Sequence, residues 1–162
     1  MSEALPRVVL DACVSANHLV CDTLRLAEQP RLYEPGRSEE ILSETLRTLE
    51  YKLGWPRSLV TFFGSEVRGN FPEALVDGYQ RWIPKMTNDP KDRHVTAVAI
   101  ASDSPTIVTF NLRHFKPADL APWYVTAVHP QQFLICSKGT PALSAPNWTN
   151  KPRSARRASR PF

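Results

Sequence analysis

The chain has 162 residues, a length that accommodates one compact domain with a sizeable apolar core. It has no run of about 18 apolar residues that would span a bilayer, and its first residues lack the basic and apolar regions of a secretory signal. We therefore expect a soluble, cytoplasmic protein that does not bind membranes. The three cysteines form no C-x-x-C pair, which argues against a disulfide framework and a zinc site and favours reduced, buried thiols.

The charges are unevenly distributed along the chain. Residues 1–134 hold 14 Lys and Arg and all 16 Asp and Glu, whereas residues 135–162 hold the other six cations and no acid. The net charge of +4 therefore combines an acidic body of −2 with a basic tail of +6. Such an arm favours a polyanionic partner.

The first predicted element is a strand at Arg7–Leu10, because this short apolar run is typical of a strand buried on both faces in a parallel sheet. Asp11 follows it directly. We predict a helix around residues 16–27, and then a turn that includes a short extended segment at residues 31–33.

The next two predicted elements are helices. Ser38 is a suitable N-cap for the first, its apolar residues recur at helical spacing, and Gly54 closes it. The apolar positions within residues 56–67 predict the second helix. The stretch from there to Met86 has no clear period.

In the second half, Asp89 and Pro90 are suited to the N-cap and first position of a helix that continues through residues 94–101. Strands are predicted at residues 106–110 and 124–128. Strands that alternate with helices indicate an α/β fold with a parallel, doubly wound sheet, whose ligands bind beyond the carboxyl ends of the strands. Asp11 and Asn111 both fall at such ends.

The periodicity stops after residue 134, where proline is spread among Ser, Thr, Asn and Arg. We expect a folded domain at residues 1–136 and a basic, disordered tail at residues 137–162.

Acidic residues that follow a strand or begin a helix are candidates for metal-dependent hydrolysis, since Mg²⁺ prefers carboxylate oxygens. Asp11 is the strongest candidate, and its alternative is a carboxylate hydrogen-bonded to a neighbouring loop. Asp89 and Asp92 could equally form a capping pair. Glu44 lies away from the apolar stripe of its helix, which fits either a solvated face or a rim position.

Two histidines, His94 and His114, are further candidates for metal ligands. Neither has a second His or Cys at ligand spacing, so structural or surface roles are favoured. Glycine-rich phosphate-binding motifs and a G-x-S-x-G elbow are absent from the sequence.

Five segments resemble the motifs of PIN-domain proteins over about residues 6–134, in the order in which that family has them. They are RVVLD ending at Asp11, SEEILSE ending at Glu44, DPKDRHV beginning at Asp89, IVTFNLRHF around Asn111, and HPQQFL ending at Leu134. The resemblance implies a three-layer α/β/α sandwich with a central parallel sheet, bound Mg²⁺ or Mn²⁺, and hydrolysis of single-stranded RNA.

The resemblance also assigns roles to residues. Asp11, Glu44 and Asp92 match the family's three usual metal-binding acids, and Asp89 would be an accessory acid or simply the cap. The fourth catalytic position, often Asp, is Asn111 here, which keeps an oxygen but loses a charge and should weaken a second metal.

Basic residues beside these acids and in the tail are candidates for holding the RNA backbone, with ordinary surface charge as the alternative. They are Lys91, Arg93 and Arg113 in the body and Arg153, Arg156 and Arg157 in the tail.

The resemblance is strongest to VapC-like toxins, which implies a cognate antitoxin protein and a homodimer. Three alternatives stay open: a catalytically inactive PIN-like module that binds RNA or protein, a nuclease directed at DNA, and a plain interaction module in which the acids are only caps. Substrate comparison and Mn²⁺ titration would discriminate among them.

Overall fold

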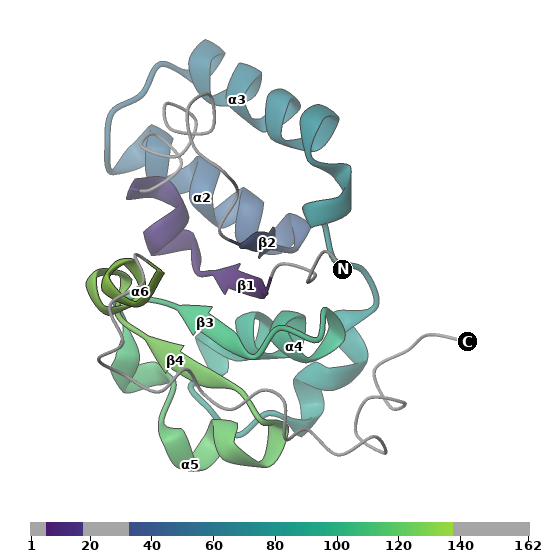
Figure 1. The fold of residues 1–162 in the computed structure, drawn as a ribbon. Coiled ribbons are helices and arrows are strands. Elements are labelled where there is room, and N and C mark those ends of the chain that lie inside the picture. Colours follow the sequence, from purple (N-terminus) through teal and green to yellow (C-terminus); the bar gives the residue numbers. More distant parts are fainter. Residues whose placement is uncertain (1–5, 18–32, 138–162) are drawn as a thin grey trace, which may run out of the picture.

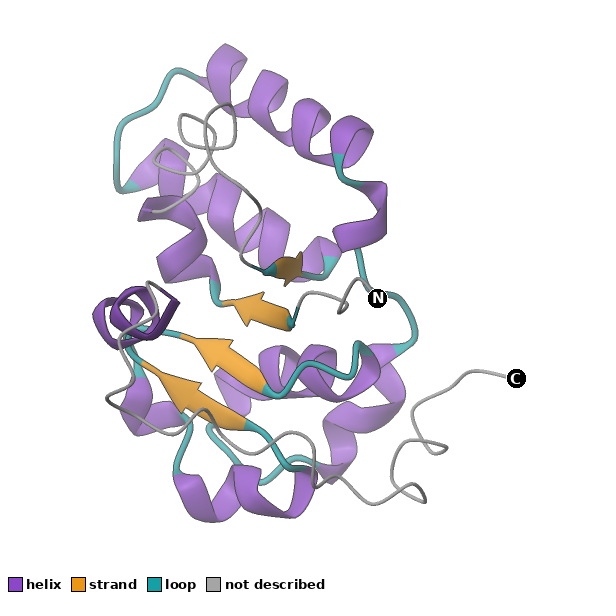
Figure 2. Cartoon of the chain, in the orientation of Figure 1, coloured by secondary structure: helices purple, strands orange, loops and turns teal. Residues whose placement is uncertain are grey.

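The computed structural model describes residues 6–17 and 33–137, and these form a parallel sheet with helices on both of its faces (Figures 1 and 2). The predicted α/β architecture is therefore confirmed. The predicted tail lies outside the described residues, apart from Ser137 at the end of the last helix, and so does most of the helix expected at residues 16–27. Residues 12–17, which are described, are helical.

Four strands form the sheet, in the order β2-β1-β3-β4, with every pairing parallel. Strand β1 (Arg7–Leu10) matches its prediction. Strand β3 (Thr106–Val108) and strand β4 (Thr126–Val128) are shorter than predicted. Strand β3 ends early because the Thr109 hydroxyl accepts the N–H of Asn111 at 3.0 Å, which turns the chain out of the sheet.

Strand β2 (Glu34–Gly36) was predicted too early, at residues 31–33. It pairs with β1 from Arg7↔Glu34 to Val9↔Gly36, so the neighbouring strand decides its position. Pro35 is tolerated there because β2 lies at the edge of the described sheet, where a missing N–H breaks no ladder.

The two faces of the sheet are buried by different elements. Val9 and Ile107 pack on one face against helix α4 (Arg93–Ala101), whose residues from 94 to 100 are all buried. Val8 and Val108 pack on the other face with Phe133 of helix α6 (Pro130–Ser137). The alternation of side chains along each strand thus supplies both apolar interfaces of a three-layer structure.

Helices α2 (Glu39–Tyr51) and α3 (Arg57–Asn70) form a pair beside β2 (Figure 1). Ser38 caps α2 as predicted, accepting the N–H of Ile41 at 3.1 Å, and Gly54 adopts a positive φ of 68° in the turn that follows. The two helices approach closely at Gly64, where a Cβ atom would lie 2.9 Å from the side chain of Leu46.

The stretch without a clear period consists mostly of 3₁₀ turns, η1 (Pro72–Ala74) and η2 (Tyr79–Lys85). Further short elements are η3 (Pro90–Asp92), η4 (Leu112–His114), α5 (Pro117–Leu120) and η5 (Ala121–Trp123). Such turns are too short to repeat an apolar stripe, which explains why the pattern did not reveal them. In the part of the chain that is described, no helix combines the length and hydropathy needed to cross a membrane.

Candidate active site

The candidate site lies at the carboxyl ends of β1 and β3. Strand β2 lies on one side of β1, and β3 lies on its other side. The chain therefore builds the sheet in opposite directions from β1, and the switch point lies between β1 and β3. Loops diverge at such a switch point and leave room for a ligand. Asp11 follows β1, and Thr109 and Asn111 follow β3.

Asp11 is buried, with 4% of its surface exposed, at the end of β1. Its carboxylate accepts the backbone N–H of Ala12 at 2.7 Å and the hydroxyl of Thr109 at 2.7 Å, and the Cys13 thiol lies 3.4 Å away as a third donor. The alternative role considered for Asp11, hydrogen bonding to a neighbouring loop, is thus present in part. It does not exclude a ligand role, because a carboxylate has about four lone-pair sites.

Thr109 connects the two strand ends. The register Leu10↔Val108 brings the next residues, Asp11 and Thr109, side by side. The Thr109 side chain donates to Asp11 and accepts from the N–H of Asn111, so it orients both the acid and the loop after β3. No role was predicted for Thr109 from the sequence, although the pairing of two predicted parallel strands points to it.

Cys13 is held as a thiol beside this acid. Burial and the nearby charge of Asp11 raise the pKa of Cys13 to about 11. A thiol with so high a pKa is a poor nucleophile and metal ligand at neutral pH. Cys13 is free and partly buried. The side chains of Cys21 and Cys136 lie outside the described residues, so the reduced, buried state of the three thiols stays a prediction.

Asp92 ends turn η3 and precedes α4, but its side chain makes no capping hydrogen bond. Instead, its Oδ2 lies 2.6 Å from Nδ1 of His114. Burial raises the pKa of Asp92, the hydrogen bond from His114 opposes that shift, and the charge of Asp11 adds to it. Asp92 and Asp11 are therefore close enough for their charges to interact.

Asp89 caps η3 by accepting the N–H of Lys91 at 3.0 Å, as one of its two predicted roles requires. A capping pair was the alternative for both Asp89 and Asp92, and the structure realises it for Asp89 alone. The accessory-acid role of Asp89 stays a prediction.

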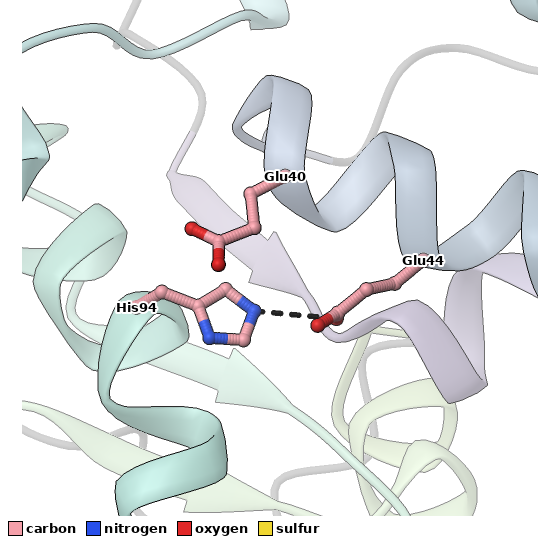
Figure 3. Close-up of side chains that lie close together, drawn as sticks. All are labelled: Glu40, Glu44 and His94. Atoms are coloured by element: carbon pink, nitrogen blue, oxygen red, sulfur yellow. Dashed lines mark hydrogen bonds and ion pairs between the residues drawn. The ribbon is translucent and has the colours of Figure 1, made fainter.

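Glu44 projects from α2 toward the start of α4, where its Oε2 lies 3.2 Å from Nε2 of His94 (Figure 3). His94 is buried, whereas the Glu44 side chain is 36% exposed, so Glu44 occupies a rim position. Burial disfavours the charged imidazole, but the Glu44 hydrogen bond and the charges of Glu44, Glu40 and Asp92 outweigh it and raise the pKa of His94. Glu40 lies one helical turn before Glu44 and accepts from the Tyr79 hydroxyl.

Two groups of side chains within the described residues bring possible ligand atoms within 4.8 Å of one another. One is Glu40, Glu44 and His94, and the other is Asp89, Asp92 and His114. The predicted trio of acids is divided between them: Glu44 lies in the first group, Asp92 in the second and Asp11 in neither. Asp92 connects the two groups with Asp11, because its charge interacts with Asp11, His94 and His114.

The two histidines were given no site role by the sequence. Each accepts or donates a hydrogen bond across a long stretch of chain, His94 to Glu44 over 50 residues and His114 to Asp92 over 22. No local spacing rule covers such pairs, so the sequence held no signal for them.

The predicted RNA-binding residues of the body differ in their surroundings. Lys91 is exposed, Arg93 is partly buried and donates from Nε to the Asn88 carbonyl, and Arg113 is exposed and donates from Nε to His114. Arg153, Arg156 and Arg157 lie outside the described residues.

A comparison with curated proteins finds a relative in Mycobacterium tuberculosis (strain ATCC 25618 / H37Rv), named "Putative ribonuclease VapC50". The two are 37% identical over 89 residues, which is 55% of this chain and 51% of the relative, so the chain spans about half the length of the curated relative it matches. No family model and no solved structure matches the chain significantly. The resemblance to VapC-like proteins, predicted from the motifs, is confirmed by this similarity.

Proposed function

We propose, from the similarity to a named ribonuclease of the VapC type, that the protein is an endoribonuclease that cleaves single-stranded RNA with Mg²⁺ or Mn²⁺. The role follows from the same similarity: the toxin of a toxin-antitoxin pair, acting in the cytoplasm and restrained by a cognate antitoxin, as a homodimer. The nuclease is assigned to residues 1–136.

The observation that supports the proposal is that Asp92, at the start of α4, lies close enough to the buried Asp11 at the end of β1 for their charges to interact. Burial is the main cause that raises the pKa of Asp92, and the charge of Asp11 adds to it, so two carboxylates in this partly buried place are unfavourable by themselves. A divalent cation removes that repulsion. A capping or purely structural role would not require Asp92 to lie beside a buried acid.

The donors suit a hard cation. Asp11 and Asp92 supply carboxylate oxygens, Glu44 supplies a third from the rim, and Mg²⁺ needs only one or two carboxylates because it retains several waters. A cation held by these residues would neutralise charge that develops on the phosphate and would activate water for attack. The Asn111 amide contributes an oxygen without charge.

The chain's own residues have separable tasks in this proposal. Thr109 orients Asp11, and Lys91, Arg93 and Arg113 bind phosphates of the RNA on either side of the acids. The tail residues Arg153, Arg156 and Arg157 extend this contact along the strand.

The test replaces Asp11 or Asp92 by Asn and measures cleavage of single-stranded RNA with Mg²⁺ or Mn²⁺. Both variants should lose roughly 100-fold or more of the rate, because each loses charge where the reaction needs it. Thermal stability of Asp92→Asn without metal should hold or rise, since carboxylate repulsion is relieved. Asp77→Asn, which changes an exposed acid, is the matched control and should cleave normally.

A wild-type rate in either variant would refute the site. Equal cleavage of single-stranded DNA would redirect the proposal to a DNA nuclease. Binding of RNA without cleavage in the wild type would favour the second candidate, an inactive PIN-like binding module, which the uncharged Asn111 at a usually acidic position supports.

A further inference from the structure

We propose that His114 is a positioning residue that holds the Asp92 carboxylate for a divalent cation without binding the cation itself. The inference deepens the proposed function and rests on it. It depends on three observations: the direction of the hydrogen bonds at both imidazole nitrogens, the way the fold places the ring, and the absence of a capping bond from Asp92.

The hydrogen bonds determine which nitrogen of His114 carries the proton. Nε2 lies 3.2 Å from Nε of Arg113. A guanidinium can only donate, so Nε2 of His114 must accept and has no proton. The proton of the neutral ring is therefore on Nδ1, which donates it to Oδ2 of Asp92 at 2.6 Å.

Both nitrogens of His114 are consequently in use. His114 is one of three residues, with Asp89 and Asp92, whose ligand atoms lie within 4.8 Å of one another. However, a metal needs a free lone pair on nitrogen, and the Arg113 bond occupies the single lone pair of this ring. The geometry therefore makes His114 a partner of the ligand. Metal-binding carboxylates are commonly oriented in this way.

The backbone holds His114 in place from two sides. Its N–H donates to the Asn111 carbonyl at 2.9 Å within turn η4, and its carbonyl accepts the N–H of Asp89 at 3.3 Å. The loop after β3 is thereby attached to the start of η3, and the ring is directed at Asp92. The side chain of His114 is 23% exposed and that of Asp92 is 16% exposed, so water competes little for the hydrogen bond between them.

The bond to His114 orients a carboxylate that makes no capping hydrogen bond. Asp92 makes no side-chain bond to the start of α4. Since Oδ2 is held by His114, Oδ1 would be left for a cation beside Asp11. Loss of the imidazole should free the carboxylate to rotate and lower metal affinity, with no effect on the fold as a whole.

The experiment measures Mn²⁺ and Mg²⁺ affinity by calorimetry on the full-length protein, with His114→Ala, His114→Asn and the control His129→Asn. Asn presents an amide N–H near the position of Nδ1. His129, whose Nδ1 accepts the N–H of Gln131, contacts neither acid in the described structure. His114→Ala should weaken both metals by about 10- to 100-fold, the usual effect of losing such a partner. His114→Asn should recover most of the affinity, and His129→Asn should change nothing.

A double-mutant cycle adds a readout that a merely structural role would not affect. In the Asp92→Asn background, His114→Ala should produce no further loss of metal affinity, because the group that it positions is already gone. Additive losses in the double variant would overturn the proposal, as would an unchanged affinity in His114→Ala.

Three further outcomes are decisive. If His114→Asn does not recover affinity and Mn²⁺ suffers more than Mg²⁺, His114 is a ligand, because imidazole favours transition metals, and the proposal fails. If Asp92→Asn binds metal as the wild type does, the proposed active site itself fails. If Asp92→Asn loses metal but His114→Ala does not, only the positioning role fails.

Discussion

At the scale of single residues, the candidate acids differ in how the fold holds them. Asp11 is buried with a hydroxyl from Thr109 and a backbone N–H from Ala12, whereas Glu44 is one-third exposed and meets a buried histidine. Asn111 shares the Thr109 hydroxyl with Asp11 through its backbone N–H. The Asn111 side chain therefore belongs to a loop whose backbone is tied, through Thr109, to the buried acid.

Replacing Asn111 by Asp should tighten Mg²⁺ and Mn²⁺ binding. A unit charge pair 4 Å apart is worth about 1 kcal/mol even in bulk water, so affinity should rise by roughly fivefold or more. The apo protein should lose some stability, because another carboxylate joins Asp11 and Asp92. Calorimetry and thermal unfolding measure the two effects.

The matched control is Asn70→Asp, which adds the same charge at the end of α3, where Asn70 contacts Glu66. It should leave metal affinity as it is. Unchanged affinity in Asn111→Asp would mean that this side chain does not face the cation.

At the scale of elements, helix α2 combines a local signal with a distant task. Ser38 is completely buried and caps the helix, and two turns later Glu44 reaches His94 of α4. The start of α2 is thus determined locally, whereas its orientation depends on burial of Ile41 and Leu49, which are fully enclosed by other elements.

Ser38→Ala should lower the free energy of unfolding by about 1 kcal/mol, because the N–H of Ile41 loses its acceptor. For a domain of this size, that corresponds to a fall in Tm of roughly 2–4 °C. Ser58→Ala, in the exposed first turn of α3, is the control and should change stability by less than about 0.5 kcal/mol. Urea titration distinguishes the two, and equal effects would show that the Ser38 bond contributes nothing.

At the scale of the whole molecule, helix α6 is the last element of the described residues. Phe133 of that helix packs against Tyr33 with ring centroids 5.2 Å apart and covers one face of the sheet. The helix therefore belongs to the folded body, although the charge of the chain changes sign shortly after residue 134.

Truncation after Ser137 should leave a folded, active domain that binds RNA more weakly. Each phosphate contact adds roughly 0.7 to the slope of log affinity against log salt concentration. If all six tail cations neutralise phosphates, the truncation reduces that slope by at most about 4. Truncation after His129 is the contrasting variant: it removes Phe133 as well and should unfold at lower denaturant. Parallel plots of RNA affinity against salt for full-length protein and the Ser137 truncation would show that the tail does not touch RNA.

Much of this arrangement was determined by local sequence. An apolar run followed by an acid places Asp11 at a strand end, and the residues that favour caps mark the starts at Ser38 and Asp89, because period and capping depend on neighbours within a few residues. The position of β2 and the end of β3 were predicted less well. Both depend on hydrogen bonds to other strands or to the following loop.

The partners of the acids were decided by the tertiary structure alone. Thr109 is 98 residues from Asp11, and the imidazoles of His94 and His114 come from a helix and a turn that packing brings to their acids. A side chain's hydrogen-bond partner is selected by which elements are packed together, and the direction of the His114 bond additionally required Arg113 on its far side. The local sequence pattern specified which acidic residues are candidates for the site, whereas packing of the sheet and α4 specified what holds each acid in place.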